Sequence, residues 1–267
     1  MPIIGISWVS GSINSIMVSI SVVTVVRNNA NGLTKTLDSL LLQGFRDWEC
    51  NIVVGESEDE SLVIAETYSS RDQRINFMKE ESKGIYGAMN DGILMSRGQY
   101  LNFMNAGDVF ANNKALELLY QEIKRGIYSV VIGNFVVDLE TTSRTALIDK
   151  TFNQFNFAFN RNWGNHQAMM FARRIPDHFY NKEYKIASDF DYVLRHLAEA
   201  PGKRIPYVVA RIESGGVSDF NLIAVYFEKF KIRNRELDSL VGKMFNIGWT
   251  AAAISKRIFM KILALVK

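Results

Sequence analysis

Phe103-Met104-Asn105-Ala106-Gly107-Asp108 is the stretch from which the fold can be worked out, because it places a carboxylate directly after a short apolar strand, residues 100–104. In an open α/β sheet, ligands bind where the parallel strands end. The strand would hold the Asp108 carboxylate in one place and leave its oxygens available to a hard divalent cation, Mg²⁺ or Mn²⁺. Asn, Gly and Asp also favour turns, so the stretch alone is compatible with a turn of no function.

Alternating strands and helices surround this stretch. The expected strands are residues 16–26, 48–54, 75–78, 100–104, 129–137, 168–171 and 205–210, and the expected helices are residues 33–41, 61–69, 85–94, 116–123, 188–197 and 221–237. Gly44 is expected to end the first helix as a C-cap residue. The third helix is expected to have one apolar face, formed by Ile85, Ala88, Met89, Ile93 and Leu94. Strands that alternate with helices in this way predict an α/β domain with a Rossmann-like, mostly parallel sheet.

Composition excludes several classes of protein. The chain has 267 residues, 48% of them hydrophobic, which suits one α/β domain with a C-terminal appendage. Its 31 basic and 28 acidic residues give no charge excess that would indicate a nucleic-acid partner. The single cysteine, Cys50, lies in an apolar run and predicts a buried thiol in the reducing cytoplasm. Residues 1–16 lack the basic start of a secretory signal and are interpreted as an added leader or a misassigned start.

A second polar cluster, Ser188-Asp189-Phe190-Asp191, opens the expected helix over 188–197. The helix dipole favours carboxylates at this end, so N-capping by Ser188 or Asp189 would explain the cluster without a catalytic role. A function for Asp189 therefore needs a further signal.

That signal is a series of seven short motifs in a fixed order. They are Ser21-Val22-Val23-Thr24-Val25 with Asn28, Thr36-Leu37-Asp38-Ser39-Leu40 with Gln43, Lys83-Gly84-Ile85-Tyr86 with Ala88-Met89-Asn90, Asn105-Ala106-Gly107-Asp108, His166-Gln167, Ala187-Ser188-Asp189, and Gly215-Gly216-Val217-Ser218. Together they resemble the family 2 inverting glycosyltransferases of the GT-A fold, most closely the bacterial sugar transferases that build colanic-acid-like and O-antigen polysaccharides. The resemblance covers residues 18–218.

The resemblance implies transfer of a hexose or an N-acetylhexosamine from a nucleotide-diphosphate sugar to a lipid-linked saccharide in surface polysaccharide synthesis. It implies a Mg²⁺ or Mn²⁺ ion at Asp108 and a catalytic base at Asp189. The donor would be bound by Thr24, Asn28, Glu56, Asp59, Lys83, Asn105 and Gly107, and the acceptor or pocket edge would be formed by His166, Gln167 and Asp191. The transferase domain would span residues 17–220.

The chain also departs from the family pattern. Many relatives have Asp-Gly-Gly-Ser after the second strand, where this chain has Val54-Gly55-Glu56-Ser57. Glu56 or Asp59 would then replace the missing carboxylate. A nucleotide-sugar binding protein with weak catalysis is the alternative interpretation. A dinucleotide-binding oxidoreductase is disfavoured, because no G-x-G-x-x-G follows the first strand.

The C-terminal segment, residues 221–267, is expected to be helical, basic and amphipathic. From Trp249 onward its apolar residues follow one helical face, while Arg257 and Lys261 mark the other side. A helix of this kind binds the interface of an anionic membrane, so the segment predicts peripheral association with the inner face of the cell membrane. The same stripe would serve a helix docked on the domain or on a second subunit, which leaves a homodimer open.

Overall fold

The computed structural model describes residues 18–137, 150–159, 164–174, 178–213, 221–237 and 240–265, with side chains of the last helix described to Lys256. The leader and the Gly215-Gly216-Val217-Ser218 motif lie outside these residues. The first half consists of β1 (Ile20–Val26), α1 (Ala30–Leu41), β2 (Trp48–Val54), α2 (Ser61–Arg71), β3 (Ile75–Lys79), α3 (Ile85–Met95) and β4 (Tyr100–Phe103). Its four strands pair in parallel, in the order β3-β2-β1-β4.

The second half adds a mixed extension to the sheet. It consists of β5 (Val109–Phe110), α4 (Ala115–Ile123), β6 (Val130–Val137), β7 (Lys150–Phe152), α5 (Gln154–Phe159), the 3₁₀ turn η1 (His166–Ala168), β8 (Met169–Ala172), α6 (Ser188–Glu199), β9 (Gly202–Ile212), α8 (Leu222–Glu236) and α9 (Leu240–Leu265). Among the described residues the nine strands run β3-β2-β1-β4-β8-β6-β9-β5, with β7 beside β9. β8 is antiparallel to β4 and β6, whereas β6 and β9 are parallel. The predicted α/β class with a mostly parallel sheet is confirmed.

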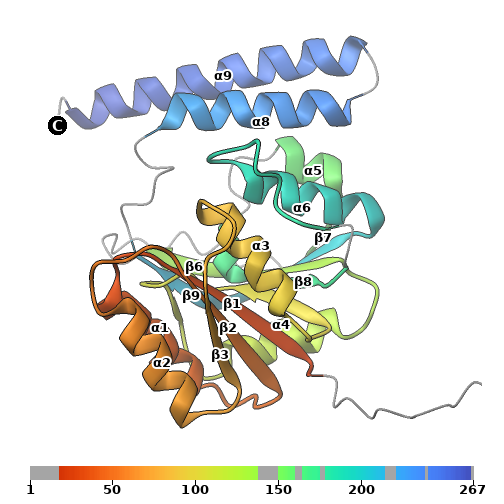
Figure 1. The fold of residues 1–267 in the computed structure, drawn as a ribbon. Coiled ribbons are helices and arrows are strands. Elements are labelled where there is room, and N and C mark those ends of the chain that lie inside the picture. The colour runs from red at the N-terminus through yellow and green to blue at the C-terminus, as the bar shows by residue number, and fades with distance from the viewer. Residues whose placement is uncertain are drawn as a thin grey trace, which may run out of the picture.

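Helices cover both faces of this sheet (Figure 1). α1, α2 and α4 pack on one face through a core that includes Leu37, Ala65 and Leu119. α3, α5 and α6 pack on the other face. Because β1 and β2 lie between both layers, all of their residues are buried, which explains why apolar residues predominate in both strands.

Two local expectations were wrong in part or in full. α1 ends at Leu41 without a glycine cap, and Gly44 instead donates its N–H to the carbonyl of Asn113 over 2.7 Å. Ala88, Met89 and Ile93 of α3 are buried as expected, but Ile85 and Leu94 are exposed at the two ends of the helix, because the sheet covers only its middle. The strand expected at residues 168–171 is confirmed as β8, one residue later, and runs antiparallel to both of its neighbours.

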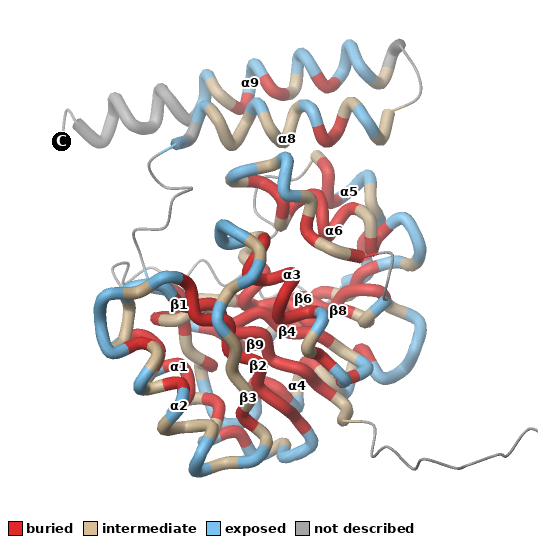
Figure 2. Tube along the Cα trace, in the orientation of Figure 1, coloured by how far each residue is buried: buried red, intermediate tan, exposed pale blue. Residues whose placement is uncertain are grey.

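α8 and α9 form an antiparallel hairpin on the α5 and α6 side of the domain (Figures 1 and 2). The buried Arg233 of α8 donates to Asn246 Oδ1 over 2.6 Å and to Thr250 Oγ over 2.8 Å, and its guanidinium lies 4.6 Å from the centre of a Trp249 ring. Burial lowers the pKa of Arg233 to about 10. The start of α9 is therefore packed on α8, and the Phe159 ring of α5 contacts the rings of Phe245 and Trp249, which docks α9 on the domain as well. No helix within the described residues is long and apolar enough to cross a membrane.

Candidate active site

Asp108 lies in the loop after β4, at the edge of the sheet where the parallel strands end. Its side chain is almost completely buried, at 6% exposed. Gln167 Nε2 donates to one carboxylate oxygen over 2.7 Å, and the backbone N–H of Glu213 donates to the other over 3.0 Å. Burial raises the pKa of Asp108 and the nearby charge of Glu213 adds to this effect, which outweighs the two hydrogen bonds. The sheet thus holds an ionisable carboxyl group in a fixed orientation.

The loop is fixed from α1 and depends on a glycine. The hydroxyl of Thr36 donates to the backbone carbonyl of Asp108 over 2.6 Å and accepts the Gly107 N–H over 3.1 Å. Gly107 has a φ of +105°, and a Cβ there would collide with Glu213 Oε2. Gly107 is therefore favoured by the positive φ of the backbone, whereas the Glu213 side chain could move aside for a Cβ.

The η1 turn connects Asp108 with the second candidate carboxylate. Gln167 binds Asp108, and the preceding residue, His166, has its Nδ1 3.8 Å from Asp189 Oδ2. Both η1 side chains are buried. The η1 turn thus links Asp108 and Asp189 through His166 and Gln167, and these four residues were predicted for the site from three different motifs.

Asp189 is the second residue of α6, and about a third of its side chain (35%) is exposed. Burial alone would raise the pKa of Asp189, but the interaction with His166 and the positive charge of Lys229 outweigh it and lower that pKa. The carboxylate is therefore ionised at neutral pH. Neither Ser188 nor Asp189 is the N-cap residue, which is Ala187, and Ser188 donates to a loop carbonyl. Asp189 Oδ1 nevertheless accepts the backbone N–H of Phe190 in the first turn over 2.7 Å, so this carboxylate also satisfies a donor at the start of the helix.

Side chains of α3 bind the backbone of the segment that precedes Asp189. The hydroxyl of Tyr86 donates to the carbonyl of Ile186 over 2.8 Å. Asn90 exchanges two hydrogen bonds with the backbone of Tyr180, over 2.9 and 2.7 Å. The rings of Tyr86 and Tyr180 stack with their centres 5.4 Å apart. The motif on α3 therefore has a clear structural role next to the site.

A pocket of about 420 Å³ opens where β2 and β3 end. It is lined by Val54, Gly55, Glu56, Ser57, Leu62, Lys79, Glu80, Glu81 and Lys83. Glu56 and Lys83, both predicted as donor-binding residues, thus share one pocket although they lie on different loops. Asp91 closes one side of it by accepting the backbone N–H groups of Glu81 and Ser82. The mixture of carboxylates and amines suits a polar ligand.

Three other predicted donor residues are placed elsewhere. Thr24 is completely buried within β1, where its hydroxyl faces Cys50 Sγ at 3.8 Å, so the prediction that it contacts the donor is corrected to a core position. Asn28 accepts a backbone N–H of the loop after β2 over 2.8 Å. Asp59 accepts the first N–H groups of α1 and α2, over 2.8 and 3.0 Å. Asn28 and Asp59 therefore order the rim of the sheet.

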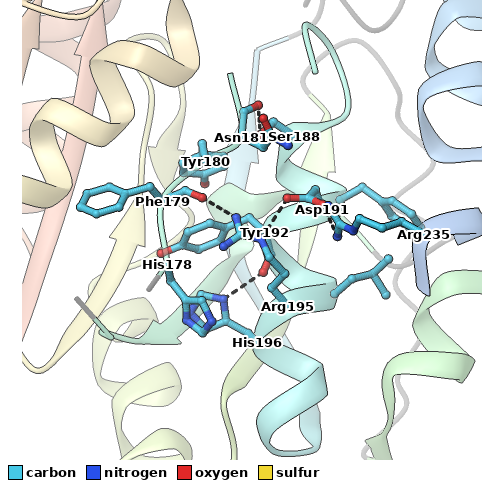
Figure 3. Close-up of polar contacts among 12 residues, drawn as sticks. His178, Phe179, Tyr180, Asn181, Ser188, Asp191, Tyr192, Arg195, His196 and Arg235 are labelled. Carbon is cyan, nitrogen blue, oxygen red and sulfur yellow. Dashed lines mark hydrogen bonds and ion pairs between the residues drawn. The ribbon is translucent and has the colours of Figure 1, made fainter. Parts of the chain in front are cut away.

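Asp191 is a buried structural residue, and Figure 3 shows its side chain among its polar contacts. Its carboxylate is fully buried and pairs with Arg195 Nε over 3.0 Å and with Arg235 Nη2 over 2.7 Å. The prediction that Asp191 lines the acceptor pocket is wrong, because it faces the two arginines and not the site. Asp191 instead ties α8 to α6.

The residues after β4 fit a divalent cation that is shared with a diphosphate. Within the described part of the chain, no three His, Cys, Asp or Glu side chains form a complete metal site. Proteins often hold Mg²⁺ through one or two carboxylates together with substrate phosphates. Asp108 and Glu213 are close enough for their charges to repel, which a cation would relieve. Asn105 Oδ1 is buried without a hydrogen-bond partner in the described structure.

Two residues near the site were not found from the sequence. Glu213 follows β9 just before the Gly215-Gly216 pair, and the signal that singled out Asp108, a carboxylate directly after an apolar strand, would have found it. Lys229 lies on α8 and meets Asp189 only through helix packing, so no local pattern marks it.

The chain is similar to several known glycosyltransferases. Glycosyltransferase GlyA of Streptococcus pneumoniae serotype 4 is 27% identical over 172 residues, which are 64% of this chain and 21% of GlyA. GlyG of the same organism is 31% identical over 117 residues, which are 43% of this chain and 38% of GlyG. A PGL/p-HBAD biosynthesis glycosyltransferase of Mycobacterium bovis is 28% identical over 178 residues, which are 66% of this chain and 68% of that protein. This chain thus spans well under half of GlyA and GlyG.

Solved structures share the GT-A fold. S. aureus TarS 1–349 superimposes with a TM-score of 0.67 at 17% identity, covering 87% of this chain and 69% of that chain. The mannosyltransferase PcManGT from Pyrobaculum calidifontis, in complex with GDP-Man and Mn²⁺, gives 0.61 at 12% identity, covering 92% and 78%. The family model for Glycosyl transferase family 2 matches residues 21–180, more than half of the sequence. The chain therefore belongs to glycosyl transferase family 2.

Proposed function

We propose that the protein is an inverting glycosyltransferase that moves a hexose or an N-acetylhexosamine from a nucleotide-diphosphate sugar to a lipid-linked saccharide in surface polysaccharide synthesis. The observation that carries the proposal is the connection through η1, in which Gln167 binds Asp108 and His166 lies beside Asp189. Asp108 would lie near the diphosphate of the donor, and Asp189 would lie near the acceptor hydroxyl. A single turn fixes both.

Asp189 acts as the general base. It takes the proton of the acceptor hydroxyl while that oxygen attacks the anomeric carbon, and the bond to the nucleoside diphosphate breaks in the same step. Attack opposite the leaving group inverts the anomeric configuration. The lowered pKa of Asp189 keeps the base ionised before the acceptor arrives.

The donor side lies between the pocket near Glu56 and Lys83 and the loop of Asp108. A Mg²⁺ or Mn²⁺ ion, held by Asp108 and Glu213, would supply positive charge that neutralises the leaving diphosphate. TarS 1–349 has also been solved in complex with UDP-GlcNAc, and PcManGT with GDP-Man, which supports a nucleotide sugar as the donor.

A thermal-shift measurement with UDP-GlcNAc and GDP-mannose, with and without Mn²⁺, tests donor binding. A donor at a hundred times its Kd is expected to stabilise the protein by about 2.7 kcal/mol, and the shift should require the cation. Release of UDP or GDP is measured in parallel. Binding without release under any condition would favour the nucleotide-sugar binding protein. If the protein neither binds any nucleotide sugar nor releases a nucleotide from it, the transferase and the binding-protein functions are both contradicted.

The α8–α9 hairpin supports a lipid-linked acceptor. Five of its apolar side chains are more than half exposed, namely Ile223, Phe227, Met244, Phe245 and Ile247. Exposed basic residues accompany them, among them Lys231, Lys243 and Lys256. Apolar burial and attraction to anionic lipid act together in interfacial helices. The enzyme would then meet its acceptor at the inner face of the membrane, on the surface where that acceptor is anchored.

Charge reversal at Arg257 and Lys261 tests this membrane contact. Removing the whole segment from residue 246 would also take away Asn246 and Thr250, which bind the buried Arg233, so point changes in the full chain are preferable. Each basic residue near an anionic surface contributes about 1 kcal/mol, so Arg257→Glu with Lys261→Glu should lower sedimentation with phosphatidylserine vesicles more than about tenfold.

The matched control is Lys35→Glu with Lys114→Glu, which makes the same change in net charge at exposed positions beside α1 and α4. This control should sediment like the unmodified chain. An unmodified chain that never sediments, or a reversed variant that still does, would remove the membrane from the proposal.

A further inference from the structure

Glu228 of α8 binds the backbone just before the candidate base. Its carboxylate accepts three consecutive backbone N–H groups, from Lys185, Ile186 and Ala187, over 2.8–2.9 Å. α6 begins at the next residue, and Asp189 is its second residue. Hydrogen bonds to an ionised carboxylate are shorter and stronger than those between neutral groups. The start of α6 is therefore fixed from a helix outside the region that matches the family.

The next residue, Lys229, brings a positive charge to the same place. Its amine lies 5.0 Å from the ring centre of Phe190, the neighbour of Asp189 in the chain. Burial lowers the pKa of Lys229, and the charge of Asp189 opposes that effect. The other titratable groups that face Asp189 are His166 of η1, Tyr86 of α3 and Tyr180 before α6. Lys229 is thus the basic residue that α8 contributes to this set.

α8 is itself held in place, so these two side chains are not free to move with a loose helix. Ile232 is fully buried in the core beneath α6. Arg235 reaches the buried Asp191 of α6 (Figure 3), and Arg233 binds α9 on the far side. A change at the hairpin would therefore be transmitted to the start of α6.

We propose that α8 is a positioning element of the active site, in which Glu228 sets the place of Asp189 and Lys229 brings a positive charge beside it. Both residues act through Asp189, and the inference rests on the proposed role of Asp189 as the base. α8 belongs to the same hairpin that exposes the apolar and basic residues described above. The hairpin would then carry both the surface that meets the membrane and the residues that position Asp189.

Titration of the aspartate side chains by ¹³C NMR tests the role of Lys229. The Asp189 signal is identified by its absence in Asp189→Asn. In Lys229→Met its midpoint should move to higher pH, because the ionised form loses a favourable charge, whereas Lys229→Arg should keep the original midpoint. Lys231→Met, an exposed lysine on the same helix, is the matched control. An unmoved midpoint in Lys229→Met, or an equal shift in Lys231→Met, overturns this role.

Hydrogen exchange and donor hydrolysis test the role of Glu228. In Glu228→Gln the amides of residues 185–187 should exchange faster, and kcat for hydrolysis of UDP-GlcNAc or GDP-mannose should fall about 10- to 100-fold with an unchanged KM, since a small displacement of a reacting group has effects of this size. Glu117→Gln, the same change at an exposed position of α4 on the opposite face of the sheet, should do neither. Unchanged exchange, or a loss confined to KM, overturns this role.

These outcomes separate the inference from the proposed function. The titration and the exchange need no turnover, so a chain that releases no nucleotide from any donor argues against the function alone. The opposite result has three parts: Asp189→Asn loses turnover, Lys229→Met leaves the midpoint unmoved, and Glu228→Gln leaves the exchange unchanged. That result argues against the positioning role of α8 alone.

Discussion

Asp189→Asn is expected to lower turnover by about 10²–10⁴-fold while donor binding stays intact, because a positioned base contributes an effect of this size to proton transfer. This corresponds to about 3–5 kcal/mol of transition-state stabilisation. The amide keeps the shape of the side chain but cannot take the acceptor proton. The measurement is kcat for nucleotide release beside the thermal shift given by the donor.

Asp72→Asn is a suitable control, since it removes a carboxylate paired with Arg74 at the opposite edge of the sheet. It should leave turnover unchanged. Unmodified turnover in Asp189→Asn would exclude the residue as the base, and a parallel loss of donor affinity would give it a binding role. Because the pKa of Asp189 is lowered, turnover of the unmodified enzyme should persist in mild acid and fall only when this carboxylate becomes protonated.

Asp108→Asn is expected to abolish the Mn²⁺-dependent part of donor binding. Hard cations prefer charged oxygen, and the substitution removes that charge from the centre of the loop. It also places an amide group against the donors Gln167 Nε2 and the Glu213 N–H, so the melting temperature without ligand must be measured as well. The main readout is the difference between the donor-induced shifts with and without Mn²⁺.

Glu49→Gln separates the loss of a buried carboxylate from the loss of a cation ligand. Glu49 is also buried and accepts three hydrogen bonds, from Ser21 and from the backbone and the guanidinium of Arg97, but at the start of β2. It should lower the melting temperature and keep the Mn²⁺ dependence. A full Mn²⁺-dependent shift in Asp108→Asn would show that the cation binds elsewhere or is not needed.

The motifs predicted which residues meet, but not always what they do. Asp108, Gln167, His166 and Asp189, all predicted from the motifs, lie close together, because each of them stands beside the beginning or the end of a strand or a helix. Thr24 belongs to the same motifs and is nevertheless a core residue. The side chains of a strand buried on both faces are all enclosed, and a sequence pattern does not show which of them borders a site.

The α/β class, most element positions and the carboxylate after β4 could be predicted from the sequence alone, because these depend on local periodicity and on the rule that ligands bind where parallel strands end. The pairing of Asp191 with Arg235 and the approach of Glu228 and Lys229 to the start of α6 depend instead on the tertiary packing. These contacts join residues some forty positions apart through the packing of one helix on another. Charge pairing at such distances is set by where α8 docks, and no periodicity within either helix encodes that.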